Sequence, residues 1–333
     1  MKADVSIRDL SLADVSVEAV YACLPARSED SLARCTDLYG DAAKAAGVVK
    51  ATGILSRRIA APGTTSLDLS TAAARALLDD LAVAPDEIGA LVFVTFTPAR
   101  VLPCNGCQAH ARLGLPRGIP AFDINLACSG WPYGLFVAGQ FARAMGRKVL
   151  LLDGDVQTDR LSPDDLATIP VLADAGTATL LTPDASAGDP WRFAFLTDGE
   201  KGDALSLPVG GSLSMDGFGV FRFVSTDVTF FIRDFLSSVS VEPAALDAFV
   251  PHQANVFMIR QIARKLGFSP EQLWVSGDVF GNSASASVPT TIAHCASPET
   301  PARLLVAGFG GGLSASAALI SLSASCRYRV FDL

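Results

Sequence analysis

Short apolar runs alternate along the chain with longer stretches rich in alanine and leucine. The short runs are rich in β-branched and leucine residues, as at 91–96 (LVFVTF), 148–155 (KVLLLDGD) and 303–310 (RLLVAGFG). Continuous apolar runs of this length are typical of strands buried on both faces, and the stretches between them are typical of helices. The alternation predicts an α/β fold, with a further strand at residues 1–10.

The pattern also repeats within the chain. The segment 83–92 (VAPDEIGALV) recurs as 241–250 (VEPAALDAFV), and both copies follow a helix that ends in two bulky residues. A second pair, 125–135 (NLACSGWPYGL) and 279–289 (VFGNSASASVP), precedes a strand in each half. Two matches in the same order predict two copies of one α/β unit, residues 1–185 and 186–333, with a connector near 183–190.

Composition narrows the class of protein. Half of the 333 residues are apolar, so the chain can bury a large core without disulfides, and seven scattered cysteines favour a reducing cytoplasm. We find no apolar export segment at the start and no apolar run as long as the roughly 20 residues of a membrane span. A formal net charge of -8 disfavours nucleic-acid binding, which needs clustered Lys and Arg.

Cys128 is the first candidate for chemistry. It lies in 121–130 (AFDINLACSG), which we interpret as a strand, a sharp turn and the start of a helix. The positive end of a helix dipole lowers a thiol pKa, and an unpaired N–H of the first turn can bind an oxyanion. The alternative is a buried structural cysteine, which is the commoner role for the residue.

Two further polar residues follow strands in the second half. His252, in 249–255 (FVPHQAN), lies just beyond a predicted buried strand, and Asn282, in 280–283 (FGNS), precedes a helical stretch. Each could instead be a structural histidine, a turn residue or an N-cap. Because all three lie at strand-to-helix junctions of the two repeats, we expect them to form one Cys-His-Asn site.

Taken together, the motifs resemble β-ketoacyl-ACP synthase III and related condensing enzymes of the thiolase superfamily. The resemblance covers nearly the whole chain and implies a thiolase-like fold, in which two pseudo-repeated halves form a five-layer αβαβα core. It is carried by six segments in family order: 52–58 (TGILSRR), 121–130 (AFDINLACSG), 215–221 (MDGFGVF), 250–255 (VPHQAN), 281–289 (GNSASASVP) and 308–312 (GFGGG).

The resemblance implies a two-stage acyltransferase of the 2.3.1 type. Cys128 takes an acyl group from coenzyme A or a carrier protein, and a malonyl or β-ketoacyl thioester then attacks it in a Claisen condensation. The backbone N–H groups of Cys128 and Gly311 would bind the first oxyanion, with glycine at 311 allowing a close approach. His252, through a proton on Nε2, and the Asn282 amide would donate to the enolate oxygen of the second stage.

The same resemblance implies substrate contacts and partners. Leu102 would reach into the tunnel of a partner subunit, which implies a homodimer, and we expect no metal and no resident cofactor, because phosphopantetheine arrives with the substrate. Cys104 and Cys107 are spaced like half a metal or redox site, but we interpret them as structural. His110 and His294 carry no motif. The implied acyl-binding residues are Leu102, Leu207, Met215, Gly217 and Phe309.

Several departures from the family pattern bear on the substrate. Gly47 and Leu166 stand where coenzyme A-dependent members place a Trp and an Arg around adenine, and the loop 173–178 (ADAGTA) is altered. Phe257 replaces an arginine that docks the carrier protein. Nearby cations could compensate for that loss. They are Arg260, Arg264 and Lys265.

These departures favour a specialised enzyme of polyketide or other secondary metabolism, with carrier-bound substrates more probable than coenzyme A thioesters. One alternative is an acyltransferase that passes the acyl group to a hydroxyl or amine without forming a carbon–carbon bond. Asn282 argues against it, since simple transfer needs a general base more than a second donor. The other is a non-catalytic partner subunit, which should lack one of the three site residues.

Overall fold

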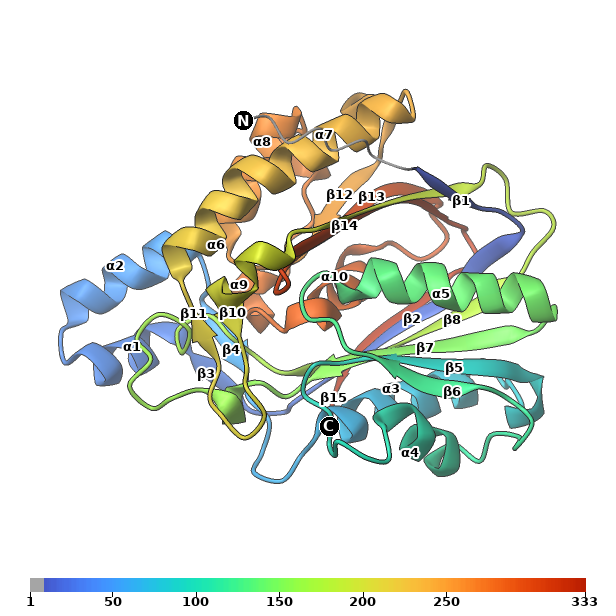
Figure 1. Cartoon of the computed structure of the whole chain (residues 1–333), viewed down its shortest axis with the longest axis horizontal. Helices are drawn as coiled ribbons and strands as arrows, with labels where there is room; N and C mark the ends of the chain where they lie inside the picture. The colour runs from blue at the N-terminus through green and yellow to red at the C-terminus, as the bar shows by residue number, and fades with distance from the viewer. Residues whose placement is uncertain (1–8) are drawn as a thin grey trace.

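Two β-sheets and three layers of helices alternate through the molecule (Figure 1). The computed structural model describes residues 9–333. The strand predicted at 1–10 therefore falls almost wholly outside the described residues, and β1 (Leu10–Leu12) is the first described strand. The sheets contain strands from both parts of the chain.

The first sheet has six strands in the order β15-β2-β8-β7-β5-β6. Its central strands β5 and β7 are parallel and buried almost throughout, as their continuous apolar runs predict. Helices α3 (Ser66–Asp80) and α4 (Asn105–Arg112) cover the outer face. The strands are β2 (Val15–Leu24), β5 (Ile88–Val94), β6 (Ala121–Ile124), β7 (Lys148–Asp155), β8 (Ala175–Pro183) and β15 (Arg327–Asp332).

The second sheet has five strands in the order β1-β9-β14-β13-β12. Helices α7 (Thr229–Ser238) and α8 (Val256–Leu266) cover its outer face with apolar residues such as Phe231, Phe235 and Ile262. Beyond β1, its strands are β9 (Trp191–Thr197), β12 (Ala248–Pro251), β13 (Ala302–Gly310) and β14 (Ser314–Leu322).

Helices α5 (Gly130–Met145) and α10 (Ser287–Cys295) form the middle layer between the sheets. Small residues let α5 approach both sheets. A Cβ added to Gly134 would lie 2.7 Å from Val94 and Leu151 of the first sheet. Trp131 fills the space beside them and is fully buried in the core shared by the two sheets.

The internal repeat is visible in the strand order. The run β2-β8-β7-β5 of the first sheet and the run β9-β14-β13-β12 of the second have the same sequence of antiparallel, antiparallel and parallel pairings. Each half lends one strand to the other sheet, because β1 pairs with β9 and β15 pairs with β2. The boundary at residue 185 stays a prediction, since the two halves exchange strands across it.

Shorter elements cover one end of the two sheets, where the site lies (Figure 1). Within residues 9–333, no helix combines the length and the apolar character that crossing a membrane requires. The short elements are α1 (Ser31–Tyr39), α2 (Ala42–Thr52), β3 (Ser28–Asp30), β4 (Ser56–Arg58), β10 (Leu205–Ser206), β11 (Ser214–Met215), α6 (Gly217–Phe223) and α9 (Gly277–Phe280).

Replacing Trp131 with alanine should lower the free energy of unfolding by about 3–5 kcal/mol, because a large side chain is lost where two sheets and a helix meet. Chemical denaturation followed by circular dichroism measures the change. The control is Val209→Ala, at a side chain that is 96% exposed, which should change the value by less than about 0.5 kcal/mol. Equal effects of the two substitutions would contradict the central role of α5.

Candidate active site

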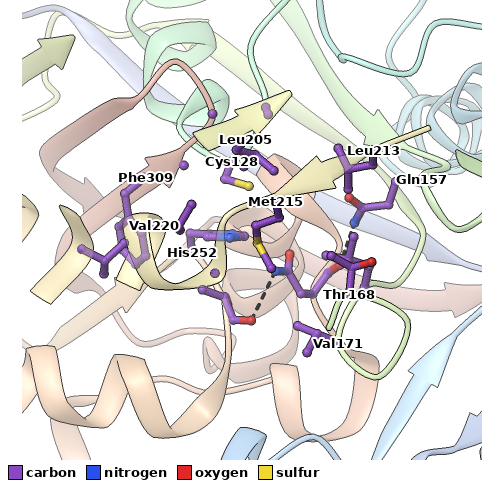
Figure 2. A pocket seen from close by; sticks show the side chains of 18 of the residues that line it. Cys128, Gln157, Thr168, Val171, Leu205, Leu213, Met215, Val220, His252 and Phe309 are labelled. Atoms are coloured by element: carbon purple, nitrogen blue, oxygen red, sulfur yellow. Dashed lines mark hydrogen bonds between the residues drawn. The ribbon is translucent and has the colours of Figure 1, made fainter. Parts of the chain in front are cut away.

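A cavity of about 580 Å³ opens at the end of the two sheets and brings the three candidate residues together. Cys128, His252 and Asn282 all line it, although they come from three separate segments of the chain. Figure 2 shows Cys128 and His252 in the cavity. Four of the predicted acyl-binding residues and Gly311 also line it. Those four are Leu207, Met215, Gly217 and Phe309.

Leu102 does not line this cavity. It lies in a surface loop and its side chain is 85% exposed. Its predicted contact with a partner subunit stays a prediction, as does the homodimer. Helix α8 starts beside the cavity, where Asn255 and Met258 belong to the lining. The predicted docking cations Arg260, Arg264 and Lys265 are exposed on this helix.

Cys128 lies in the turn between β6 and α5, as the sequence predicts. Ala127 accepts a hydrogen bond of 2.7 Å from the N–H of Gly130, and α5 begins there. The turn packs directly on β13: a Cβ on Gly308 would lie 2.7 Å from the carbonyl oxygen of Cys128, and one on Gly310 would lie 3.0 Å from its sulfur. Only glycine at these two positions leaves the turn in place.

Hydroxyl groups from β14 hold the same turn. Ser316 donates a hydrogen bond of 2.8 Å to the carbonyl oxygen of Ser129, and the hydroxyl groups of Ser129 and Ser314 lie 2.6 Å apart. Ser314 is also 2.7 Å from the carbonyl oxygen of Gly311, to which its hydroxyl donates. The second sheet therefore fixes the position of a nucleophile that the first half of the chain supplies.

The prediction of a lowered thiol pKa for Cys128 is wrong for this resting structure. The pKa of Cys128 is raised to about 12, mainly by burial and also by the nearby carboxyl groups of Asp155 and Asp153. A backbone hydrogen bond lowers this pKa, but by less than burial raises it. The dipole of α5 does not overcome the loss of solvent around the sulfur. At neutral pH the group is a thiol, so acylation requires removal of its proton.

The two buried aspartates are functional candidates that sequence reasoning missed. Asp155 accepts hydrogen bonds through one oxygen from Thr95 and Thr97, and Asp153 accepts one of 2.8 Å from the hydroxyl of Ser285. No described residue bonds to the other oxygen of either carboxyl group. Burial raises the pKa of Asp155 to about 7 and that of Asp153 well above its usual range. The sequence feature that could have identified them is the pair of aspartates at the end of a predicted apolar strand.

His252 follows β12 and is almost completely buried. Its Nδ1 lies 3.0 Å from the carbonyl oxygen of Ala284 and 2.9 Å from the hydroxyl oxygen of Ser287. Burial lowers the pKa of His252 to about 4, which makes the imidazole neutral at pH 7. If Nδ1 carries the proton, it donates a hydrogen bond to the carbonyl oxygen of Ala284. If Nε2 carries the proton, Nδ1 accepts a hydrogen bond from the hydroxyl of Ser287. The network therefore accommodates both tautomers.

Asn282 follows the short helix α9 and not the predicted strand, and its backbone forms an isolated bridge with Leu172. The carboxamide of Asn282 has a defined orientation. Its oxygen accepts a hydrogen bond of 3.0 Å from the N–H of Ala284, and its nitrogen donates one of 3.2 Å to the carbonyl oxygen of Ala254. A flipped amide would place its oxygen against that carbonyl. One N–H of the amide therefore remains for a group in the cavity, as the predicted role of Asn282 requires.

The comparisons with known proteins agree with this geometry. Residues 122–199 match the family model of 3-oxoacyl-[acyl-carrier-protein] synthase III, and residues 236–322 match the model of its C-terminal part. A β-ketoacyl-[acyl-carrier-protein] synthase III of Vibrio parahaemolyticus is 34% identical over 284 residues, covering 82% of this chain and 89% of that protein. This chain belongs to the β-ketoacyl-ACP synthase III family.

Solved structures give the same answer for the fold. A 3-oxoacyl-(acyl-carrier protein) synthase from Burkholderia xenovorans superposes with a TM-score of 0.91 at 30% identity, covering 97% of this chain and 99% of the other. The priming β-ketosynthase of a polyketide biosynthetic pathway gives a TM-score of 0.83 at 27% identity, covering 96% and 99%. The predicted thiolase-like fold and the predicted class, an acyl-transferring enzyme, are confirmed.

The positions that depart from the β-ketoacyl-ACP synthase III pattern lie on the surface around the site. Gly47 is exposed with nothing within 4 Å of an added Cβ, and Leu166 is partly exposed in a loop held by a hydrogen bond of 2.7 Å from Tyr39. Phe257, on the first turn of α8, is 51% exposed. None of these three residues is charged, and Leu166 and Phe257 expose apolar side chains.

The remaining candidates lie apart from the cavity. His110 contacts the carbonyl oxygen of Pro116 at 2.9 Å, and His294 packs its edge on the ring of Phe280. The sulfur of Cys107 is 3.6 Å from the carbonyl oxygen of Ala121. Within residues 9–333, no group of three or more His, Cys, Asp or Glu side chains is placed to hold a metal ion.

The raised thiol pKa predicts a distinctive pH dependence. The rate at which iodoacetamide alkylates Cys128 should still be rising at pH 10, because the thiolate fraction grows until the pH passes about 12. At pH 7 the reaction should be slower than that of a free cysteine. Mass spectrometry of the peptide that contains Cys128 separates this site from the other cysteines. A rate that levels off below pH 8 would contradict the raised pKa.

Gly310→Ala should strongly reduce alkylation and acylation of Cys128, because the added methyl group would lie 2.8 Å from its Cβ. The turn must then shift, and a displacement of about 1 Å at a reacting atom can cost about a hundredfold in rate. The control is Gly118→Ala, where an added Cβ meets nothing within 4 Å. Unchanged labelling of Gly310→Ala would show that β13 does not position the nucleophile.

Proposed function

We propose that this enzyme forms a carbon–carbon bond in two stages, first holding an acyl group as a thioester on Cys128 and then condensing it with a malonyl or β-ketoacyl thioester. The observation that carries the proposal is the convergence of a thiol, an imidazole and an oriented carboxamide on one cavity. Family membership supports the class of reaction.

In the first stage the proton of Cys128 must leave, because the thiol is neutral at rest. No Asp, Glu, Lys or Tyr lines the described cavity. The neutral imidazole of His252 does line it, and histidine is the most common general base in enzymes, so we assign it the removal of this proton. The sulfur then attacks the acyl carbonyl carbon and the donor leaves as its thiolate, which takes up a proton. The N–H groups of Cys128 and Gly311 stabilise the oxyanion of this step.

In the second stage the extender becomes a carbanion. Loss of carbon dioxide from a malonyl thioester leaves an electron pair that is delocalised onto the thioester oxygen as an enolate. A proton on Nε2 of His252 and the free N–H of Asn282 stabilise that oxygen. The carbanion attacks the acyl group on Cys128, and the sulfur leaves as a thiolate that takes up a proton from water. Both donors are held by hydrogen bonds before substrate arrives, so little reorganisation is needed.

Carrier-protein thioesters are the proposed substrates. The relatives are named for the acyl carrier protein. The exposed cations Arg260, Arg264 and Lys265 on α8 would attract the acidic carrier, with Phe257 adding an apolar contact. The phosphopantetheine arm would arrive with the substrate, so the proposal includes no resident cofactor. A homodimer in which Leu102 contacts the partner is part of the same proposal.

A role in polyketide or other specialised metabolism is supported by the uncharged residues Gly47 and Leu166 and by the similarity to a polyketide priming ketosynthase. Offering acetyl-CoA with malonyl carrier protein tests it: efficient formation of acetoacetyl carrier protein would favour the priming step of fatty-acid synthesis instead. The alternative reaction, transfer of the acyl group to a hydroxyl or amine, gains no support from the site. That reaction would not use the free N–H of Asn282.

Intact-protein mass spectrometry with a panel of acyl donors tests both stages. Cys128→Ala should abolish the mass added by the acyl group, whereas Asn282→Ala should retain acylation and lose condensation by about a hundredfold or more, the typical cost of one oxyanion donor. Gln272→Ala, which removes a carboxamide that lies outside the cavity lining, is the control. Condensation by both Cys128→Ala and Asn282→Ala would overturn the assigned roles.

A further inference from the structure

The side chain of Gln157 is a polar group in the cavity that the two-stage reaction does not use. It follows β7, it lines the cavity and the residue is only 2% exposed. In Figure 2, Gln157 lies on one side of Cys128 together with Thr168, Val171 and Leu213, whereas Phe309 and Val220 lie on the other side. We define Gln157, Thr168, Val171 and Leu213 as the Gln157 arm.

The amide of Gln157 is held in one orientation. Its nitrogen donates hydrogen bonds of 2.9 Å to the carbonyl oxygen of Ala173 and 2.8 Å to that of Asn282, so both of its protons are used. A flipped amide would place its oxygen against those two carbonyl oxygens. Oε1 is consequently left over, and no residue of the described chain donates a hydrogen bond to it.

Thr168 adds a second acceptor of the same kind. Its hydroxyl donates a hydrogen bond of 2.5 Å to a carboxylate oxygen of Asp165, so the oxygen that remains can only accept. The residue is buried and lines the cavity beside Val171. Within the Gln157 arm, Gln157 and Thr168 therefore offer acceptors and no free side-chain donor, and the other two members, Val171 and Leu213, are apolar.

A buried acceptor without a partner opposes the binding of an apolar group. While the cavity is empty, water can satisfy Oε1 of Gln157, but an alkyl chain that displaces this water leaves the oxygen unpaired. Sites built to hydrogen-bond a substrate group reject the analogue that lacks it far more strongly than an apolar pocket discriminates by size.

We propose that the Gln157 arm selects acyl groups that carry a hydrogen-bond donor, such as a hydroxyl, over plain alkyl chains of the same length. This inference rests on the proposed function, because it concerns the acyl group that Cys128 receives. The donor would bind Oε1 of Gln157 while Val171 and Leu213 contact the adjoining methylene groups. Carboxylate, ether and ketone groups bring only acceptors and would be disfavoured there.

Acylation of Cys128 by matched thioesters measures the preference. The probes are pantetheine thioesters of hexanoate and of its 3-, 5- and 6-hydroxy derivatives, and intact-protein mass spectrometry gives each second-order rate constant. At least one hydroxylated chain should react about tenfold faster than hexanoyl, or more, because pairing one buried acceptor is worth about that factor. Equal rates for all four probes would overturn the inference.

Gln157→Leu should lower the ratio of hydroxylated to plain rates by about tenfold, because it replaces the acceptor with an apolar side chain of similar size. The substitution also removes two hydrogen bonds to the backbone, so the ratio is the readout and not the rate itself. Leu213→Ala, which changes the volume of the arm but not its polarity, is the matched control and should leave the ratio unchanged.

The outcomes separate the two proposals. If Gln157→Leu slows all four probes equally, the side chain is only structural and the inference fails while the proposed function stands. If none of the four thioesters modifies Cys128, the proposed acyl-enzyme and the inference fall together. A ratio that falls in Gln157→Leu and holds in Leu213→Ala supports both.

Discussion

Backbone contact between β13 and the turn that carries Cys128 is the constraint on which the site depends. Gly308 and Gly310 allow that contact, because a Cβ at either position would overlap the turn. The same strand also places the imidazole: the N–H of His252 donates a hydrogen bond of 2.7 Å to the carbonyl oxygen of Ala307, and the ring packs edge-on against Phe309. One strand thereby sets the spacing of Cys128 and His252.

Burial gives this site a neutral resting state. The thiol pKa of Cys128 is raised and the imidazole pKa of His252 is lowered, so neither group is charged at pH 7. Asp153 and Asp155 oppose a thiolate, which makes a permanently ionised nucleophile costly. In the proposed reaction, charge would develop only when a substrate oxygen can take it up among fixed donors.

The sequence predicts that Cys128, His252 and Asn282 meet, and all three line one cavity. Cys128 and His252 follow strands β6 and β12, as predicted, because strand ends of an α/β fold meet at one edge. Asn282 follows the short helix α9 instead, a loop position that apolar periodicity does not predict. The alternation of apolar runs and helical stretches predicts the α/β class, and the family resemblance implies the five layers. The thiol pKa could not be predicted, since it depends on how deeply α5 packs and on two acids that the first sheet turns inward. Gln157 was missed because its importance comes from carbonyl groups of distant segments that use up its N–H protons.

The amide of Gln157 links substrate choice to catalysis through a single planar group. Its nitrogen donates to the backbone carbonyl of Asn282, the proposed enolate donor, while its oxygen receives no hydrogen bond from the described chain. Because the amide is planar, the two hydrogen bonds made by its nitrogen also fix the direction of its oxygen. The backbone of the Asn282 loop therefore sets the direction of the acceptor on which the proposed selection of acyl groups depends.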